Sequence, residues 1–146
     1  MLRVGTVGTS SIMRTIQEAI RLTDGMECRV VYSRTEEQGR AFAAEMGVPE
    51  HCTDYAAMLE RSDLDLIDIA SPNRFHVEQA LAALEHGKHV IVEKPAAVTR
   101  GDVQRLIDAA RANGVYFFEA ITTLFMPQYE ACRLLLPKLG RIEQAH

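Results

Sequence analysis

The stretch VGTVGTSSIM (Val4–Met13) joins a run of β-forming residues to a short turn and then to an amphipathic pattern. Gly8 opens the turn, and the apolar residues after it recur at the spacing of one helical face as far as Leu22. A strand, a glycine turn and a helix in direct succession are typical of the first unit of a dinucleotide-binding domain. The stretch therefore predicts a strand over Leu2–Val7, a helix over Ser11–Leu22 and an anion-binding turn between them.

The same alternation of short β-branched runs and longer helical patterns continues along the chain. Further strands are expected at Cys28–Ser33, His51–Thr53, Leu66–Ala70, Val90–Glu93 and Val115–Phe118. Further helices are expected at Glu36–Met46, Tyr55–Arg61, Phe75–His86, Thr99–Asn113 and Gln128–Leu136. This order favours a parallel sheet covered on both faces, and right-handed crossovers then give a doubly wound, mostly parallel α/β fold of the Rossmann kind.

The length of 146 residues corresponds to about one domain. We expect residues 1–120 to form the dinucleotide-binding domain and residues 121–146 to begin a connection to a further α/β domain. The final segment GRIEQAH supports this division, because Arg141–Ala145 alternates like the first half of a strand.

Composition excludes several classes of partner. A net charge of −4 without a basic stripe argues against nucleic-acid binding. No apolar run approaches the roughly 18 residues that span a bilayer, so no membrane partner and a cytoplasmic location are expected. The three cysteines show no ligand spacing, which favours reduced thiols and no metal site.

The glycine turn is a partial match to the dinucleotide fingerprint G-x-G-x-x-G/A. Gly8 takes the first place, Ser10 the second and Met13 the third, while Gly5 is expected to be a packing position within the strand. Ser10 keeps a backbone N–H for the pyrophosphate and adds a hydroxyl, whereas Met13 implies looser packing of helix on strand. The alternative is a common turn without a ligand. The cofactor contacts expected here are Gly8, Thr9, Ser10 and Ile12.

The end of the second predicted strand indicates which dinucleotide is bound. NAD sites usually place Asp or Glu there, but this chain has Tyr32-Ser33-Arg34-Thr35. The guanidinium of Arg34 can pair with a 2′-phosphate, and Ser33 and Thr35 can donate hydrogen bonds. We therefore expect NADP ahead of NAD. A solvated arginine is the alternative, and Glu36 and Glu37 leave NAD possible.

The segment SPNRFHVEQALAALEHGKHVIVEKPAA (Ser71–Ala97) resembles the Gfo/Idh/MocA oxidoreductases. The resemblance rests on Pro72-Asn73 followed by His76, on Gly87-Lys88-His89-Val90 and on Glu93-Lys94-Pro95, and it extends from Leu2 to about Ile142. It implies a two-domain enzyme that is a homo-oligomer at full length. The implied reaction is hydride transfer between a nicotinamide and a hydroxyl-bearing carbon of a sugar, cyclitol or related diol.

The resemblance also implies roles for single residues. Lys94 becomes the catalytic residue beside the nicotinamide and the reacting hydroxyl; the alternative is a surface lysine at a strand end. A cis peptide bond is expected before Pro95. Glu93 is expected to contact the cofactor or orient the lysine, with a structural ion pair as its alternative.

A fourth group of expected site residues follows the Leu66–Ala70 strand. Ser71 and Asn73 stand at the carboxyl edge where doubly wound folds bind ligands, and Asn73 is expected to meet the cofactor. For His76 two roles are open, namely lining the nicotinamide pocket or capping its own helix.

Two departures from the family pattern limit the inference. Leu124 stands where many relatives carry an arginine, and the substrate-binding groups of the family's second domain are missing from these residues. We therefore expect the 146-residue chain to bind its cofactor but to show little or no turnover. A non-catalytic NAD(P)-binding sensor and a scaffold without nucleotide are the competing hypotheses.

Overall fold

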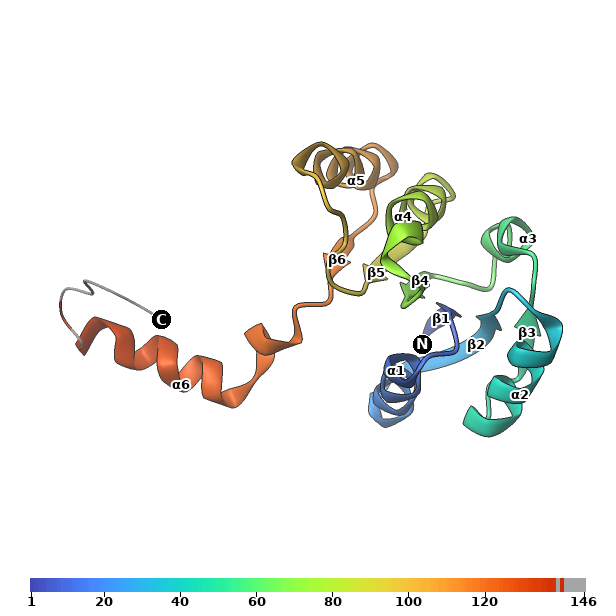
Figure 1. Cartoon of the computed structure of the whole chain (residues 1–146), viewed down its shortest axis with the longest axis horizontal. Coiled ribbons are helices and arrows are strands. Elements are labelled where there is room, and N and C mark those ends of the chain that lie inside the picture. Colours follow the sequence, from blue (N-terminus) through green and yellow to red (C-terminus); the bar gives the residue numbers. More distant parts are fainter. Residues whose placement is uncertain (139, 141–146) are drawn as a thin grey trace.

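The computed structural model describes residues 1–138 and 140, and it places six parallel strands in one sheet. The strand order is β3-β2-β1-β4-β5-β6 (Figure 1). The strands are β1 (Leu2–Val7), β2 (Met26–Tyr32), β3 (Glu50–Cys52), β4 (Leu66–Ile69), β5 (His89–Val92) and β6 (Phe117–Glu119). The predicted doubly wound α/β fold is confirmed.

Helices cover both faces of this sheet. They are α1 (Ser11–Leu22), α2 (Glu36–Met46), α3 (Tyr55–Leu59), α4 (His76–Glu85), α5 (Arg100–Asn113) and α6 (Pro127–Leu135). Figure 1 shows α1 and α2 on one face and α4 and α5 on the other. The predicted bounds of β1, α1 and α2 are confirmed, and those of the other elements differ from the observed ones by at most two residues at either end, as helix and strand ends usually do.

The core lies on both sides of β4, whose four residues are all buried. Ile67 and Ile69 pack toward the side of α4 and α5, where Leu84 and Leu106 are fully buried. Gly5 on β1 is a packing position, as predicted, because an added Cβ would lie 3.1 Å from the side chains of Ile67 and Leu64. A nearly continuous apolar strand of this kind is typical of a parallel sheet buried on both faces.

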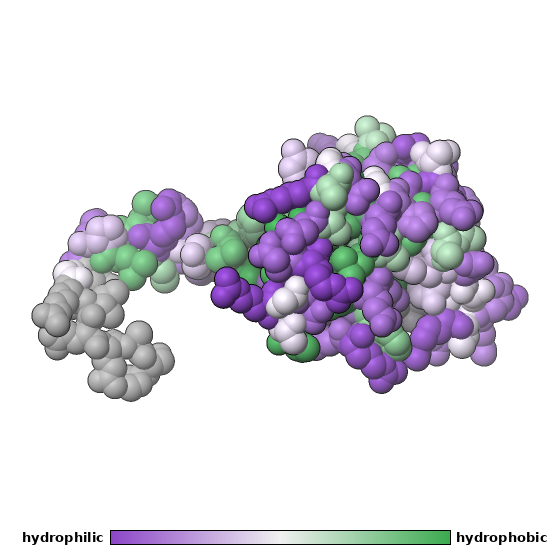
Figure 2. Space-filling model, turned by 90° about the horizontal axis from the view of Figure 1, so that it is seen from above, coloured by the Kyte–Doolittle hydropathy of each residue, from purple (hydrophilic) through white to green (hydrophobic). Residues whose placement is uncertain are grey.

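Beyond β6 the chain leaves the sheet. Figure 1 shows α6 extending away from it, and Figure 2 shows this part as a separate lobe with hydrophobic patches. Phe125 and Leu134 are among its exposed apolar residues. The division at residue 120 stays a prediction, and the expected strand at Arg141–Ala145 lies outside the described residues. No helix in the described part of the chain is long and apolar enough to cross a bilayer.

Candidate dinucleotide-binding groove

The carboxyl ends of the strands line three adjoining hollows. The first hollow reaches from Gly8 and Arg34 to Gln79, the second includes Asn73, and the third includes Thr122. The first and second share Ser10, Ala70, Ser71 and Pro72, and the second and third share Ile12, Glu93 and Lys94. Because neighbouring hollows share lining residues, they form one continuous groove along this edge of the sheet.

Most of the predicted site residues line this groove. Those in the first hollow are Gly8, Thr9, Ser10, Ser33, Arg34 and Ser71, and those in the second are Ser10, Ile12, Ser71, Asn73, Glu93 and Lys94. Thr35 and His76 are not among the lining residues of the three hollows. The fold therefore brings residues as far apart in the sequence as Gly8 and Lys94, more than 80 positions, to the same groove.

Two features of Gly8 require glycine. Its φ of 111° lies in the left-handed region, which side chains disfavour. An added Cβ would lie 2.8 Å from the carbonyl oxygen of Ala70, at the end of the neighbouring strand β4. The turn after β1 therefore presses directly against the backbone after β4, and the two together form the floor of the first hollow.

Ser10 is the N-cap of α1, and its hydroxyl oxygen accepts a hydrogen bond of 3.4 Å from the backbone N–H of Met13. The hydroxyl hydrogen stays available to a ligand, because only its oxygen is used by the cap. The first N–H groups of a helix lack intrahelical partners and favour an anion. The start of α1 thus presents donors to the groove.

Met13 is part of the core. Its side chain is fully buried in one cluster with Val31 and Phe42. Its complete burial does not indicate the looser packing that was expected of methionine at the third fingerprint position.

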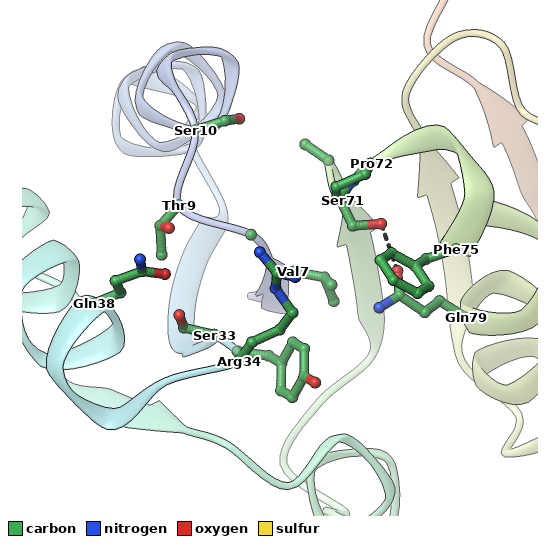
Figure 3. Close-up of a pocket in the computed structure, with 13 residues that line it drawn as sticks. Val7, Thr9, Ser10, Ser33, Arg34, Gln38, Ser71, Pro72, Phe75 and Gln79 are labelled. Carbon is green, nitrogen blue, oxygen red and sulfur yellow. Dashed lines mark hydrogen bonds between the residues drawn. The ribbon is translucent and has the colours of Figure 1, made fainter.

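Arg34 reaches into the first hollow from the end of β2. Figure 3 shows its side chain between Thr9 and Ser33 on one side and Ser71 and Phe75 on the other. Ser33 is buried, and its backbone N–H donates to the carbonyl of Cys52 over 3.0 Å. The exposed guanidinium has no hydrogen-bond or ion-pair partner within residues 1–138 and 140.

Thr35 caps α2 instead of lining the hollow, since its hydroxyl oxygen accepts from the N–H of Gln38 over 3.4 Å. The Gln38 side chain does line the first hollow, although the sequence reasoning missed it. The pattern Thr35-x-x-Gln38 is a capping-box signature, and it could have placed Gln38 in the first turn, next to the strand end.

Two residues of the opposite wall of the first hollow, Phe75 and Gln79, were also not predicted from the sequence. The hydroxyl of Ser71 donates to Oε1 of Gln79 over 2.6 Å, and Phe75 and Pro72 add apolar surface (Figure 3). Phe75 and Gln79 are four positions apart, the spacing of neighbours on one helical face. This spacing is the sequence signal that could have predicted that both residues line the hollow.

The turn that carries Lys94 is held by two carboxylates. The Lys94–Pro95 peptide bond is cis, which confirms the prediction. Oε2 of Glu93 accepts from the backbone N–H of Lys94 over 3.2 Å, and Oε1 of Glu119 accepts from the N–H of Ala96 over 2.9 Å. Glu93 thus bonds to the lysine backbone, and within the described ranges it forms no ion pair with the Lys94 ammonium. Glu119, at the end of β6, was not expected to take part.

His76 lies in neither of the two predicted places. It does not line the groove or cap its own helix; its ring is fully buried at the start of α4. The two ring nitrogens lie 2.8 Å from the carbonyl oxygen of Ser71 and 2.9 Å from that of Pro95. Both carbonyls belong to residues that line the groove, so the buried ring lies behind the groove lining.

A buried acid lies on β4, one residue before the strand ends. Asp68 on β4 is only 6% exposed, and its Oδ1 has no hydrogen-bond partner in the described part of the chain. Burial, and secondarily the charge of Glu93, raises the pKa of Asp68 to about 7. Within residues 1–138 and 140, no three His, Cys, Asp or Glu side chains form a group able to hold a metal ion.

Comparison with known proteins gives this groove a family context. Residues 2–121 match the Gfo/Idh/MocA family, described as an oxidoreductase family with an NAD-binding Rossmann fold. The chain is 35% identical over 144 residues to the scyllo-inositol 2-dehydrogenase (NADP(+)) IolU of Bacillus subtilis, covering 99% of this chain and 44% of that protein. It is 39% identical over 116 residues to the 1,5-anhydro-D-fructose reductase of Ensifer adhaerens, covering 79% and 34% of the two chains.

Solved structures agree with the sequence relatives. The biliverdin reductase of Synechocystis sp. PCC 6803, solved with biliverdin and NADP+, matches with a TM-score of 0.85 and 30% identity over 96% of this chain and 44% of that chain. The 3-ketoreductase KijD10 of Actinomadura kijaniata, solved with NADP and TDP-benzene, matches with a TM-score of 0.89 and 30% identity over 94% and 42%. The chain spans less than half the length of these relatives. By sequence match and by fold, it belongs to the Gfo/Idh/MocA family of oxidoreductases, with an NAD-binding Rossmann fold.

Proposed function

We propose that this chain binds NADP along the groove and forms the nucleotide-binding part of a dehydrogenase. The proposed substrate is a sugar, cyclitol or related diol, oxidised or reduced at a hydroxyl-bearing carbon. The observation that carries the proposal is the continuity of the groove, which joins Arg34 and the start of α1 to Lys94. The names of the relatives, an inositol dehydrogenase and sugar reductases among them, support this substrate class.

The residues of the first hollow fit a phosphorylated dinucleotide. Gly8 lines this hollow without a side chain, so its backbone can approach a pyrophosphate closely, and α1 begins beside it. None of the residues lining this hollow is Asp or Glu, so the usual acceptor for the ribose hydroxyls of NAD is missing. Glu36 instead lies 2.7 Å from the ring of His51. Arg34 supplies the positive charge that a 2′-phosphate requires.

The third hollow fits the nicotinamide end of the dinucleotide and the reacting part of the substrate. The bound dinucleotide would supply hydride transfer at its nicotinamide. Lys94 is exposed to this hollow, and we assign its Nζ to hydrogen-bond the reacting oxygen of the substrate. The neutral amine would take up the hydroxyl proton when the alcohol is oxidised, and the ammonium would return it when the carbonyl is reduced. Glu93 and Glu119 hold the backbone on either side of Lys94 and so position it.

Turnover requires more than these residues supply. The reacting carbon has to be held within about 3.5 Å of the nicotinamide. Among the described residues the third hollow, which is open, lies beside Lys94 to receive the substrate, and we expect the 146-residue chain to bind NADP with little or no catalysis. The cytoplasmic location and the homo-oligomeric state at full length also stay predictions.

A titration of the purified chain with NADP and with NAD tests the cofactor assignment. A ligand that binds the folded state raises the apparent stability by mass action, so NADP should raise the melting temperature more than NAD does. Arg34→Ala should narrow this difference. Arg40→Ala, an exposed arginine on α2 that does not line the groove, is the matched control. Equal responses to the two nucleotides, or no response to either, would contradict the assignment.

The competing function is an NAD(P)-binding sensor without catalysis. Retention of Lys94 in the third hollow favours the enzyme, because a sensor does not need a proton-exchanging group there. Lys94→Ala in a full-length version separates the two hypotheses. Loss of turnover with retained NADP binding supports the dehydrogenase, whereas an unmodified full-length protein that binds NADP without any turnover supports the sensor.

A further inference from the structure

His76 contacts the backbone of two loops that line different parts of the groove. One ring nitrogen lies 2.8 Å from the carbonyl oxygen of Ser71, which lines the first and second hollows. The other lies 2.9 Å from the carbonyl oxygen of Pro95, which lines the third hollow and directly follows Lys94. The ring is 0% exposed, so water does not compete for these contacts.

The partners of His76 restrict what the ring can do. Both are backbone carbonyls, which only accept hydrogen bonds, and a neutral imidazole carries a single N–H. Only one of the two loops can therefore receive a full hydrogen bond from the neutral ring. The neutral ring then donates to one carbonyl and only contacts the other, so substitution can separate the two contacts.

Independent bonds hold the far side of each loop. The N–H of Ala96 donates to Glu119, and the Ser71 hydroxyl donates to Gln79. Within the described ranges, His76 is the side chain whose ring nitrogens lie at hydrogen-bond distance from both loops. Removing it leaves the two loops joined through the pairing of β4 with β5, where the N–H of Glu93 donates to the carbonyl of Ile69 over 2.8 Å, and without a side-chain contact beyond the strand ends.

We propose that His76 is a positioning residue that fixes the distance between the Ser71 loop and the Lys94–Pro95 turn. Its effect falls on a ligand that spans the groove and not on one that occupies the first hollow alone. The ligand in question follows from the proposed function, on which this part of the inference rests. NADP spans the groove, whereas adenosine 2′,5′-bisphosphate, its fragment with the 2′-phosphate, matches only the Arg34 end.

The test compares the two ligands on His76 variants of the 146-residue chain. His76→Leu removes both ring nitrogens. His76→Asn keeps a donor near the position of Nδ1, facing Pro95, and His76→Gln keeps one near Nε2, facing Ser71. His86→Leu is the matched control, because His86 is an exposed residue at the other end of α4.

We expect His76→Leu to weaken NADP binding about tenfold, the size of one lost hydrogen bond, and to leave the affinity for adenosine 2′,5′-bisphosphate within about twofold. At least one of His76→Asn and His76→Gln should restore NADP affinity, and which one does so identifies the loop that receives the N–H. His86→Leu should change neither affinity. Equal loss for both ligands would indicate a general structural role and would overturn the proposal, as would no loss for either.

Hydrogen exchange in the ligand-free chain provides a readout that does not depend on the cofactor. The Ala96 amide should exchange faster in His76→Leu than in the unmodified chain, while the amide of Val31, a buried residue of β2, should not change. If His76→Leu does not fold, the Asn and Gln variants carry the same comparison. Faster Ala96 exchange without any NADP binding by the unmodified chain would refute the proposed function alone, and unchanged exchange would refute the positioning role alone.

Discussion

Replacing Asp68 with asparagine should remove a large pH dependence from the stability of the fold. Asp68 lies in the centre of the sheet, where β4 pairs with Thr6 of β1 and with Ile91 of β5. Its carboxyl is buried, which raises its pKa to about 7 from an ordinary value of 3.8. Asparagine has nearly the same shape and cannot ionise, so it removes the charge without opening a cavity.

The sign follows from proton binding. Because the pKa is higher in the folded chain than in the unfolded chain, the folded chain binds the extra proton between about pH 4 and pH 7. The protonated carboxyl contributes its full stability below pH 3.8, and this contribution is lost as the pH rises through about 7. At about 1.4 kcal/mol per pKa unit, the complete loss is on the order of 4 kcal/mol. That is a large share of the roughly 5–15 kcal/mol by which a domain is stable.

Urea unfolding at a series of pH values measures the effect. Between pH 5 and pH 8 the free energy of unfolding of Asp68→Asn should rise by about 2–3 kcal/mol relative to that of the unmodified chain. The slope is the readout, because the amide introduces a donor of its own and shifts the absolute value. Asp63 and Asp65, whose pKa values are lowered to about 2 by Arg61 and Arg3, lose their contribution only below about pH 4.

A second variant tests the cause of the pKa shift. Glu93→Gln removes the charge of Glu93, which is the smaller of the two causes of the raised pKa of Asp68. The free energy of unfolding of this variant should therefore keep most of its dependence on pH. If the free energies of unfolding of Asp68→Asn and of the unmodified chain change by the same amount between pH 5 and pH 8, Asp68 is not a buried group that binds a proton in the folded chain, and the prediction is refuted.

Two further substitutions test the packing around the first hollow. Gly8→Ala should destabilise the fold by about 2–3 kcal/mol more than Gly25→Ala, because both glycines have positive φ but only at Gly8 would the Cβ meet another atom, the Ala70 oxygen. Urea unfolding of the pair measures this difference, and equal losses would show that the Ala70 contact relaxes freely. Met13→Ala should cost about 2–5 kcal/mol if this buried side chain fills the core, and a loss below about 1 kcal/mol would indicate loose packing instead.

Local sequence patterns were sufficient for the architecture. The short β-branched runs, the helical patterns between them and the glycine turn at Gly8 are short-range signals, and they predicted the order of strands and helices. A parallel sheet then brings the carboxyl ends of its strands to one edge. This rule was enough to gather Ser10 and Arg34 at one groove without knowledge of any contact, whereas Lys94 was predicted from the family resemblance.

The contacts within the groove depend on segments far apart in the sequence. The atom that excludes a side chain at Gly8 belongs to Ala70, and the partners of His76 include Pro95. Periodicity predicts which face a side chain is on, but it carries no information about which distant loop lies against that face.

The same limit applies to charge. Asp68 reads in the sequence as an acid within an apolar strand, and nothing near it in the chain predicts its pKa, because desolvation depends on every element packed around it. The sequence by itself therefore determined the fold and the edge at which a ligand is expected. Only the tertiary structure decided which side chains face that ligand, which hold the loops in place and which are buried, since hydrogen bonding and burial are properties of the packed chain.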